Sequence, residues 1–108
     1  MSDVETVPAV EVPDEARLLD VREAYEFRAG RAPGALHMPV EEVPERFEAE
    51  LDPDEDYFVI CRTGGRSIQM AGWLTQQGYS VLFVAGGYDA WVTSGRALES
   101  DDGQPRIL

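Results

Sequence analysis

Short apolar runs alternate with amphipathic stretches along most of this chain, and this alternation constrains the fold more than any other feature. The run 57–60 is continuous and apolar, which is typical of a strand buried on both faces of a parallel sheet. The same reasoning predicts further strands at 17–21, 35–38 and 80–84, and helices at 23–29, 41–51, 67–77 and 88–94. We therefore predict an α/β fold with a parallel sheet, right-handed crossovers and helices on both faces.

The length of 108 residues fits one domain with a single hydrophobic core. Residues 1–16 are rich in Pro, Val and acids, and they form an N-terminal segment that could add an edge strand at 7–12. Residues 17–97 are expected to be the domain itself. Residues 98–108 are expected to form a polar, loosely held C-terminal tail. Gly30 is placed to end the first helix.

The charge balance limits the classes of partner. The formal net charge is −12, and all nine cations are arginine. We expect no binding to nucleic acid or to an anionic membrane, since both require basic surfaces. The absence of lysine excludes a Schiff-base lysine and a P-loop lysine. Arginine without lysine is also typical of a bacterial genome rich in G and C.

The sequence favours a cytoplasmic setting. No apolar run approaches the ~20 residues that a membrane span needs, and the acidic N-terminus does not resemble an ordinary secretory signal. Cys61 is the only cysteine, so an internal disulfide is impossible and a reducing compartment is expected.

The segment that follows the predicted strand 57–60 is the candidate active site, and Cys61 is its candidate nucleophile. A free thiol has a pKa near ~8.5, but three features here favour a negatively charged sulfur. These are the N-terminus of the next helix, a turn of two glycines that can face backbone N–H groups inward, and two arginines. An inert packing cysteine would need none of them. The candidate binding residues are Arg62, Thr63, Gly64, Gly65 and Arg66.

The length of this loop discriminates between ligands. Cysteine phosphatases have five residues between their cysteine and arginine, which makes a ring of amides wide enough for phosphate. Only four residues separate Cys61 from Arg66. A tighter ring fits a single sulfur bonded to Cys61 better than a phosphate group.

Several separated blocks of the sequence resemble the rhodanese family, the single-domain thiosulfate sulfurtransferases. The blocks lie at 19–23 with 25–27, 30–39, 61–67, 78–79, 86–87 and 90–91. The resemblance implies a single rhodanese-like domain with a five-stranded parallel sheet between helices, commonly a monomer. It implies no metal or organic cofactor. One departure is Arg31, which stands where the family often has histidine.

The resemblance also implies a role for each site residue. Cys61 would take a sulfane sulfur from thiosulfate or a similar donor, become a persulfide, and pass the sulfur to a thiol or to cyanide. The amides of 62–66 would hold the outer sulfur, and the two loop arginines would attract the donor. Asp20 and Arg22 follow another strand, so both are expected near the site, with Asp20 paired to a loop arginine.

Two alternatives remain open from the residues alone. The chain could be a non-enzymatic module that carries sulfur to a specific partner, and its acidic surface would then dock a basic protein. A cysteine phosphatase or an arsenate reductase is the other alternative. The short loop argues against it, and a single cysteine leaves no resolving thiol for arsenate chemistry.

Overall fold

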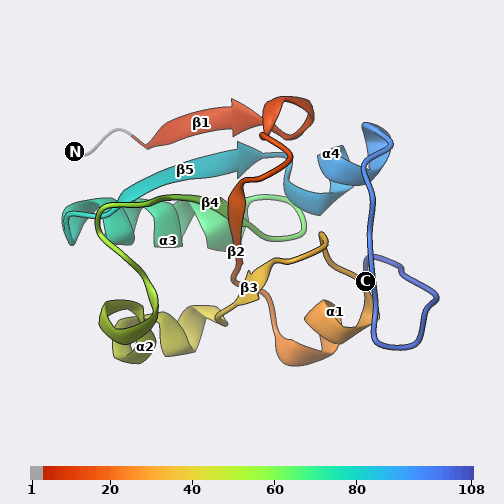
Figure 1. Cartoon of the computed structure of the whole chain (residues 1–108), viewed down its shortest axis with the longest axis horizontal. Helices are drawn as coiled ribbons and strands as arrows, with labels where there is room; N and C mark the ends of the chain where they lie inside the picture. The colour runs from red at the N-terminus through yellow and green to blue at the C-terminus, as the bar shows by residue number, and fades with distance from the viewer. Residues whose placement is uncertain (1–3) are drawn as a thin grey trace.

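Five parallel strands form one sheet in the computed structural model, which describes residues 4–108 (Figure 1). Their order across the sheet is β1-β5-β4-β2-β3, so β4 lies at its centre. All neighbouring strands run parallel, as the alternation of strands and helices predicts. The strands are β1 (Glu5–Pro8), β2 (Arg17–Asp20), β3 (Leu36–His37), β4 (Asp56–Ile60) and β5 (Ser80–Ala85).

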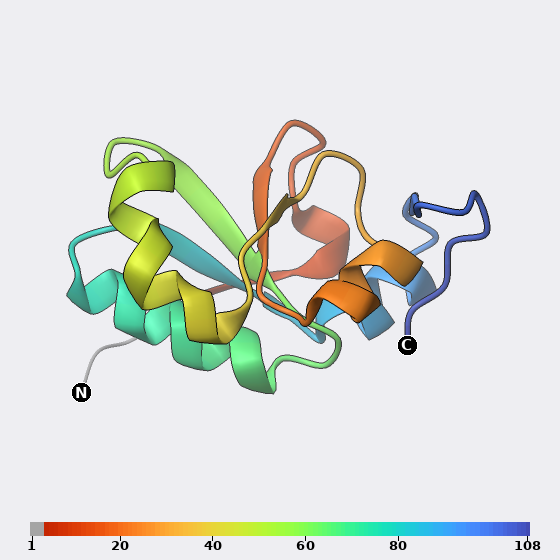
Figure 2. The ribbon, with the colours of Figure 1, turned by 90° about the horizontal axis from the view of Figure 1, so that it is seen from below.

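Helices cover both faces of the sheet, which confirms the predicted layers (Figures 1 and 2). Helices α2 and α3 pack on one face, and α4 with the 3₁₀ turn η1 packs on the other. The α-helices are α1 (Ala24–Ala29), α2 (Val43–Glu50), α3 (Gly65–Gln76) and α4 (Gly87–Thr93). The 3₁₀ turns are η1 (Ala9–Glu11) and η2 (Val40–Glu42).

The core divides into two clusters because successive strand residues point to opposite faces. Leu19 and Val59 face α2 and α3, whereas Leu18 and Ile60 face η1 and α4. All four are buried, which explains why the central strands are continuously apolar and do not alternate with polar residues.

The predicted edge strand exists, but it lies at Glu5–Pro8 and pairs with β5, whereas the sequence placed it at 7–12. Pro8 has no N–H to extend the ladder, and the chain turns into η1 directly after it. Helix α3 begins at Gly65, two residues before the predicted start, so its first turn lies inside the cysteine loop.

Gly30 ends α1 as predicted, although the reason is not a left-handed backbone. Its φ of −178° is extended, a conformation that any residue adopts. A Cβ at this position would lie 2.2 Å from the carbonyl oxygen of Arg106. Glycine is therefore required because the C-terminal tail passes directly over it.

The C-terminal tail is not loosely held, which corrects the expectation from its polar sequence. Arg31 and Glu99 exchange two backbone hydrogen bonds of 2.9 and 2.8 Å, and the N–H of Arg106 donates to Ala29 O at 3.0 Å. Figure 1 shows the tail running beside α1. The Arg31 side chain also forms an ion pair with Glu99, so this departure from the family pattern fastens the tail.

Between residues 4 and 108, none of the helices combines the length and the hydropathy that a membrane-spanning helix requires.

Candidate active site

Cys61 directly follows the central strand β4, at the carboxyl-terminal edge of the sheet where parallel α/β folds place their ligands. The residue exposes only 1% of its surface and packs in the same cluster as Val59 and Ala71. Burial alone would suit an inert thiol, so the contacts of the sulfur decide between the two interpretations.

Two backbone amides point at the Cys61 sulfur. Gly64 N–H lies 3.1 Å from Sγ and Ser67 N–H lies 3.4 Å from it. Both belong to the opening of α3, where the first N–H groups have no partner inside the helix and carry the positive end of its dipole. The sulfur is therefore buried beside two backbone donors of the kind that bind anions at helix N-termini.

Ser67 is a site residue that the sequence analysis did not single out. Its Oγ lies 3.2 Å from Cys61 Sγ and also 3.2 Å from Gly64 O, and the whole residue is buried. The hydroxyl can accept a hydrogen bond from the thiol or donate one to a charged sulfur. The only sequence signal for this role was its place in the first turn of a helix directly after the loop.

Helix α4 fixes the orientation of the cysteine loop through two backbone hydrogen bonds. The N–H groups of Tyr88 and Asp89 donate to Cys61 O at 2.9 Å and to Arg62 O at 3.0 Å. In a trans peptide the C=O and the following N–H point in opposite directions, so the N–H groups of Arg62 and Thr63 face away from α4. The contact with α4 thus fixes which side of the loop presents hydrogen-bond donors.

Gly87 makes this contact possible. Its φ is +55°, and a Cβ there would lie 2.2 Å from Cys61 O and 2.7 Å from Arg62 O. Gly64 is similarly constrained, because its φ is +136° and a Cβ would meet the Phe83 ring at 2.9 Å. At Gly65, by contrast, a Cβ would meet open space.

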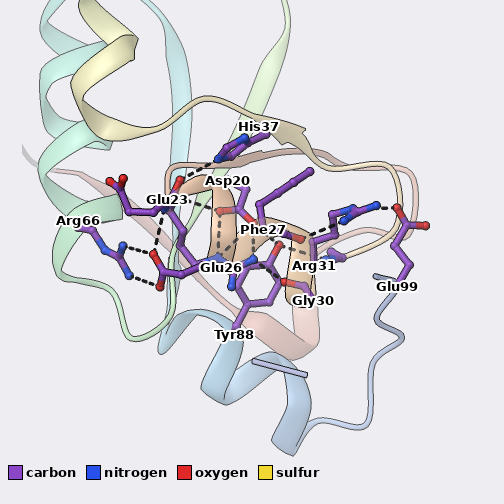
Figure 3. Close-up of polar contacts among 12 residues, drawn as sticks. Asp20, Glu23, Glu26, Phe27, Gly30, Arg31, His37, Arg66, Tyr88 and Glu99 are labelled. Carbon is purple, nitrogen blue, oxygen red and sulfur yellow. Dashed lines mark hydrogen bonds and ion pairs between the residues drawn. The ribbon is translucent and has the colours of Figure 1, made fainter. Parts of the chain in front are cut away.

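Arg66 does not stand free beside the sulfur. Its guanidinium forms two parallel hydrogen bonds to the Glu26 carboxylate, at 2.6 and 3.0 Å (Figure 3). The Glu26 side chain is 7% exposed and also accepts the N–H of Glu23, within a capping box that opens α1. Hydrogen bonding to Arg66 lowers the pKa of Glu26.

Glu26 is a second residue that the sequence analysis did not single out. The capping-box spacing was a signal for the helix start but not for its contact with the loop.

Asp20 and Arg22 pair with each other, which corrects the expectation that Asp20 would hold a loop arginine. Arg22 Nη2 lies 2.8 Å from Asp20 Oδ2, and both side chains are fully buried. Tyr88 OH donates to the same carboxylate at 2.9 Å, and burial followed by the Asp20 charge raises the pKa of Tyr88. Since the Tyr88 N–H binds Cys61 O, this cluster supports the loop indirectly through α4.

His37 has a structural position. Its Nε2 lies 2.8 Å from Arg22 O, and its ring stacks on Phe27 with the centroids 4.4 Å apart (Figure 3). Within residues 4–108, no three His, Cys, Asp or Glu side chains are grouped so that they could hold a metal ion.

The comparison with known proteins agrees with this geometry. A sulfurtransferase of Allochromatium vinosum is 36% identical over 91 residues, covering 83% of this chain and 84% of its own. The thiosulfate sulfurtransferase GlpE of Actinobacillus succinogenes is 38% identical over 88 residues, covering 81% of this chain and 78% of its own. The crystal structure of a rhodanese-related protein from Thermoplasma volcanium superposes with a TM-score of 0.82 at 29% identity, covering 87% of this chain and 96% of that one.

Residues 9–94 match the family described as the rhodanese-like domain. That match spans β2 to α4, including Cys61 and every residue found in contact with its loop. The chain therefore belongs to the rhodanese-like family.

Proposed function

We propose that this protein is a sulfurtransferase that carries sulfur as a persulfide on Cys61. The Cys61 thiolate attacks the outer sulfur of a sulfane donor such as thiosulfate. A bond forms between Sγ and that sulfur, and the bond to sulfite breaks, with the electron pair leaving on sulfite. A thiol or cyanide then attacks the outer sulfur of the persulfide and restores the thiolate.

One observation carries the proposal. The Sγ of the only cysteine lies within hydrogen-bond reach of two amides and a hydroxyl at the start of α3. The two amides are fixed before reaction, so they stabilise a sulfur anion without reorganising. The same donors support both the attacking thiolate and the terminal sulfur of a persulfide.

Sulfur transfer suits the loop better than phosphate transfer. Four residues separate Cys61 from Arg66, and the Arg66 guanidinium already forms two hydrogen bonds to Glu26. A phosphatase would need that guanidinium to bind two phosphate oxygens. This engagement and the short loop both favour a single sulfur atom as cargo.

The remaining parts of the proposal concern setting and partners. A persulfide turned over by thiols requires a reducing compartment, so the proposed location is the cytoplasm, with the chain acting as a monomer and without a cofactor. The strongly acidic composition, with net charge −12, makes a basic protein the expected partner if the sulfur is delivered to a protein.

Intact mass spectrometry after incubation with thiosulfate tests the proposal. Wild type should gain the mass of one sulfur, and cyanide should remove it with release of thiocyanate. Cys61→Ser should gain nothing, whereas Ser94→Ala, a change at the exposed residue directly after α4, should behave as wild type. No gain of mass with thiosulfate or any other sulfane donor would refute the proposal. A gain that small acceptors cannot remove would favour the partner-specific carrier instead.

A further inference from the structure

The two arginines of the loop are held very differently. Arg66 binds the buried Glu26 carboxylate through two hydrogen bonds of 2.6 and 3.0 Å. The Arg62 side chain forms one ion pair with the Asp89 side chain, in which Nε lies 3.5 Å from Oδ1 and both side chains are 52% exposed. The first is a fixed pair with good geometry, and the second is a weak pair on the surface.

This difference separates two roles that the sequence assigned to both arginines. Moving Arg66 toward a donor would leave the Glu26 charge buried and without its partner, which is costly. Moving Arg62 costs little, because water replaces the contact with Asp89. An anionic donor that approaches the sulfur therefore meets Arg62 as the cation able to turn toward it.

The α1 side of the loop is also unfavourable for an anion. The nearby carboxylate of Glu41 raises the pKa of Glu23, which stands beside Glu26. That shift is the effect of carboxylates crowded near Arg66, whose own charge is already paired with Glu26. Asp89 lies in the first turn of α4, and its N–H binds the loop at Arg62 O.

We propose that Asp89 determines how well the site accepts an anionic sulfur donor, by competing with that donor for the guanidinium of Arg62. The inference rests on the proposed function and names a positioning residue for it. With Asp89 in place, both loop arginines are paired with carboxylates. A sulfur donor of low net charge then binds almost as well as an anionic donor does. Without that carboxylate, a dianion such as thiosulfate gains an unpaired guanidinium.

The backbone and the side chain of Asp89 can be tested separately. Its N–H donates to Arg62 O and its carbonyl accepts from the Thr93 hydroxyl, and both bonds persist when only the side chain changes. Asp89→Asn keeps the shape and removes the charge. The matched control is Asp54→Asn, which removes one exposed negative charge from the turn before β4, at the opposite end of that strand from Cys61.

The first measurement is the steady-state rate with thiosulfate and cyanide at low salt. Asp89→Asn should lower KM for thiosulfate by about two- to fivefold with little change in kcat, the size expected for releasing one exposed ion pair. The effect should shrink as salt rises, because salt screens exposed charges. Asp54→Asn should leave KM unchanged, and in an Arg62→Ala background Asp89→Asn should lose most of its effect.

A second readout does not depend on sulfur transfer. Cys61 is alkylated by iodoacetate, an anion, and by iodoacetamide, its neutral analogue, and both products are quantified by mass. Asp89→Asn should raise the ratio of the iodoacetate rate to the iodoacetamide rate, and Arg62→Ala should lower that ratio. If thiosulfate forms no persulfide but this ratio moves as expected, the inference about Asp89 stands while the proposed donor fails.

The inference is overturned by any of three results. The first is a KM and an alkylation ratio that Asp89→Asn leaves at wild-type values. The second is an equal effect from Asp54→Asn, which would show that only total charge matters. The third is a full effect of Asp89→Asn in the absence of Arg62.

Discussion

Substituting Gly87 with alanine should displace the cysteine loop, although Gly87 lies outside that loop, at the start of α4. Gly87 is the first residue of α4, with φ +55°, and a Cβ would lie 2.2 Å from Cys61 O and 2.7 Å from Arg62 O. These two carbonyls accept the N–H groups of Tyr88 and Asp89. Non-bonded heavy atoms settle at about 3.5 Å, so the helix and the loop must separate by more than about 1 Å.

The magnitude follows from two contributions. A left-handed backbone costs alanine roughly 1–2 kcal/mol. Weakening two backbone hydrogen bonds adds about 1–3 kcal/mol, because each contributes about 0.5–1.5 kcal/mol net. Gly87→Ala should therefore lower the free energy of unfolding by about 2–5 kcal/mol, a large share of the roughly 5–15 kcal/mol typical of a domain.

Gly95→Ala is the matched control for the backbone contribution. Gly95 has φ +77°, and a Cβ there meets no heavy atom within 4 Å. It should lose only the roughly 1–2 kcal/mol of the left-handed conformation, so the additional loss in Gly87→Ala measures the contact between α4 and the loop. Urea unfolding followed by tryptophan fluorescence gives both values.

The rate of persulfide formation on Cys61 completes the experiment. Gly95→Ala should react as wild type does under folded conditions. Gly87→Ala should be slower by up to about 100-fold, since a 1 Å misplacement of a reacting group can cost that much. Equal urea midpoints and equal persulfide rates for the two variants would show that α4 does not position the loop.

Two further predictions concern the ion pairs around the site. Because Arg66 lowers the pKa of Glu26 in the folded chain, that stabilisation is present above the unfolded pKa of about 4.3 and is lost as pH falls through the lower folded pKa. Glu26→Gln should thus cost most stability near pH 7 in urea unfolding, and its cost should fall progressively as pH drops below about 4.3; a cost that does not change with pH would contradict this. Asp20→Asn leaves Arg22 buried without its charged partner and should lower the free energy of unfolding by about 3–5 kcal/mol. Glu42→Gln, at the exposed pair with Arg46, should lower it by less than about 1 kcal/mol. Equal losses would contradict the role of burial.

The parts of the fold that the sequence predicted are those determined by neighbouring residues. The continuous apolar strand 57–60 and the helix after it required a buried parallel strand followed by a crossover, and both are present. Cys61 had to lie at the carboxyl-terminal edge of the sheet, because it directly follows such a strand. Local pattern was sufficient for each of these inferences.

The partners of the charged residues could not be predicted in this way. Asp20 and Glu26 were both available to a loop arginine, and the position of Asp20 at a strand end favoured Asp20. The choice depends on how α1 sits against the loop: Asp20 is covered by Tyr88 and bound to Arg22, while the capping box turns Glu26 toward Arg66. The hydrophobic periodicity of the sequence does not indicate how α1 is oriented against the loop. A chain with many acidic residues also offers each arginine several partners.

The attachment of the C-terminal tail also could not be predicted from the sequence. Its polar composition suggested weak attachment, but composition reports only the absence of an apolar face. The tail is held by backbone hydrogen bonds to Ala29 and Arg31, which any sequence can form. The signal that did exist was Gly30, which has no side chain at the point where Arg106 passes over it.

The geometry of the cysteine loop is therefore determined by distant parts of the chain as well as by its own sequence. Gly64 and the start of α3 supply donors to the sulfur, but α4 fixes the direction of the loop peptides by binding two of their carbonyls. That approach requires Gly87 to lack a side chain. A chain with the same six-residue loop and a larger residue at the position of Gly87 should keep its cysteine and lose the orientation of the loop amides, which the proposed chemistry requires.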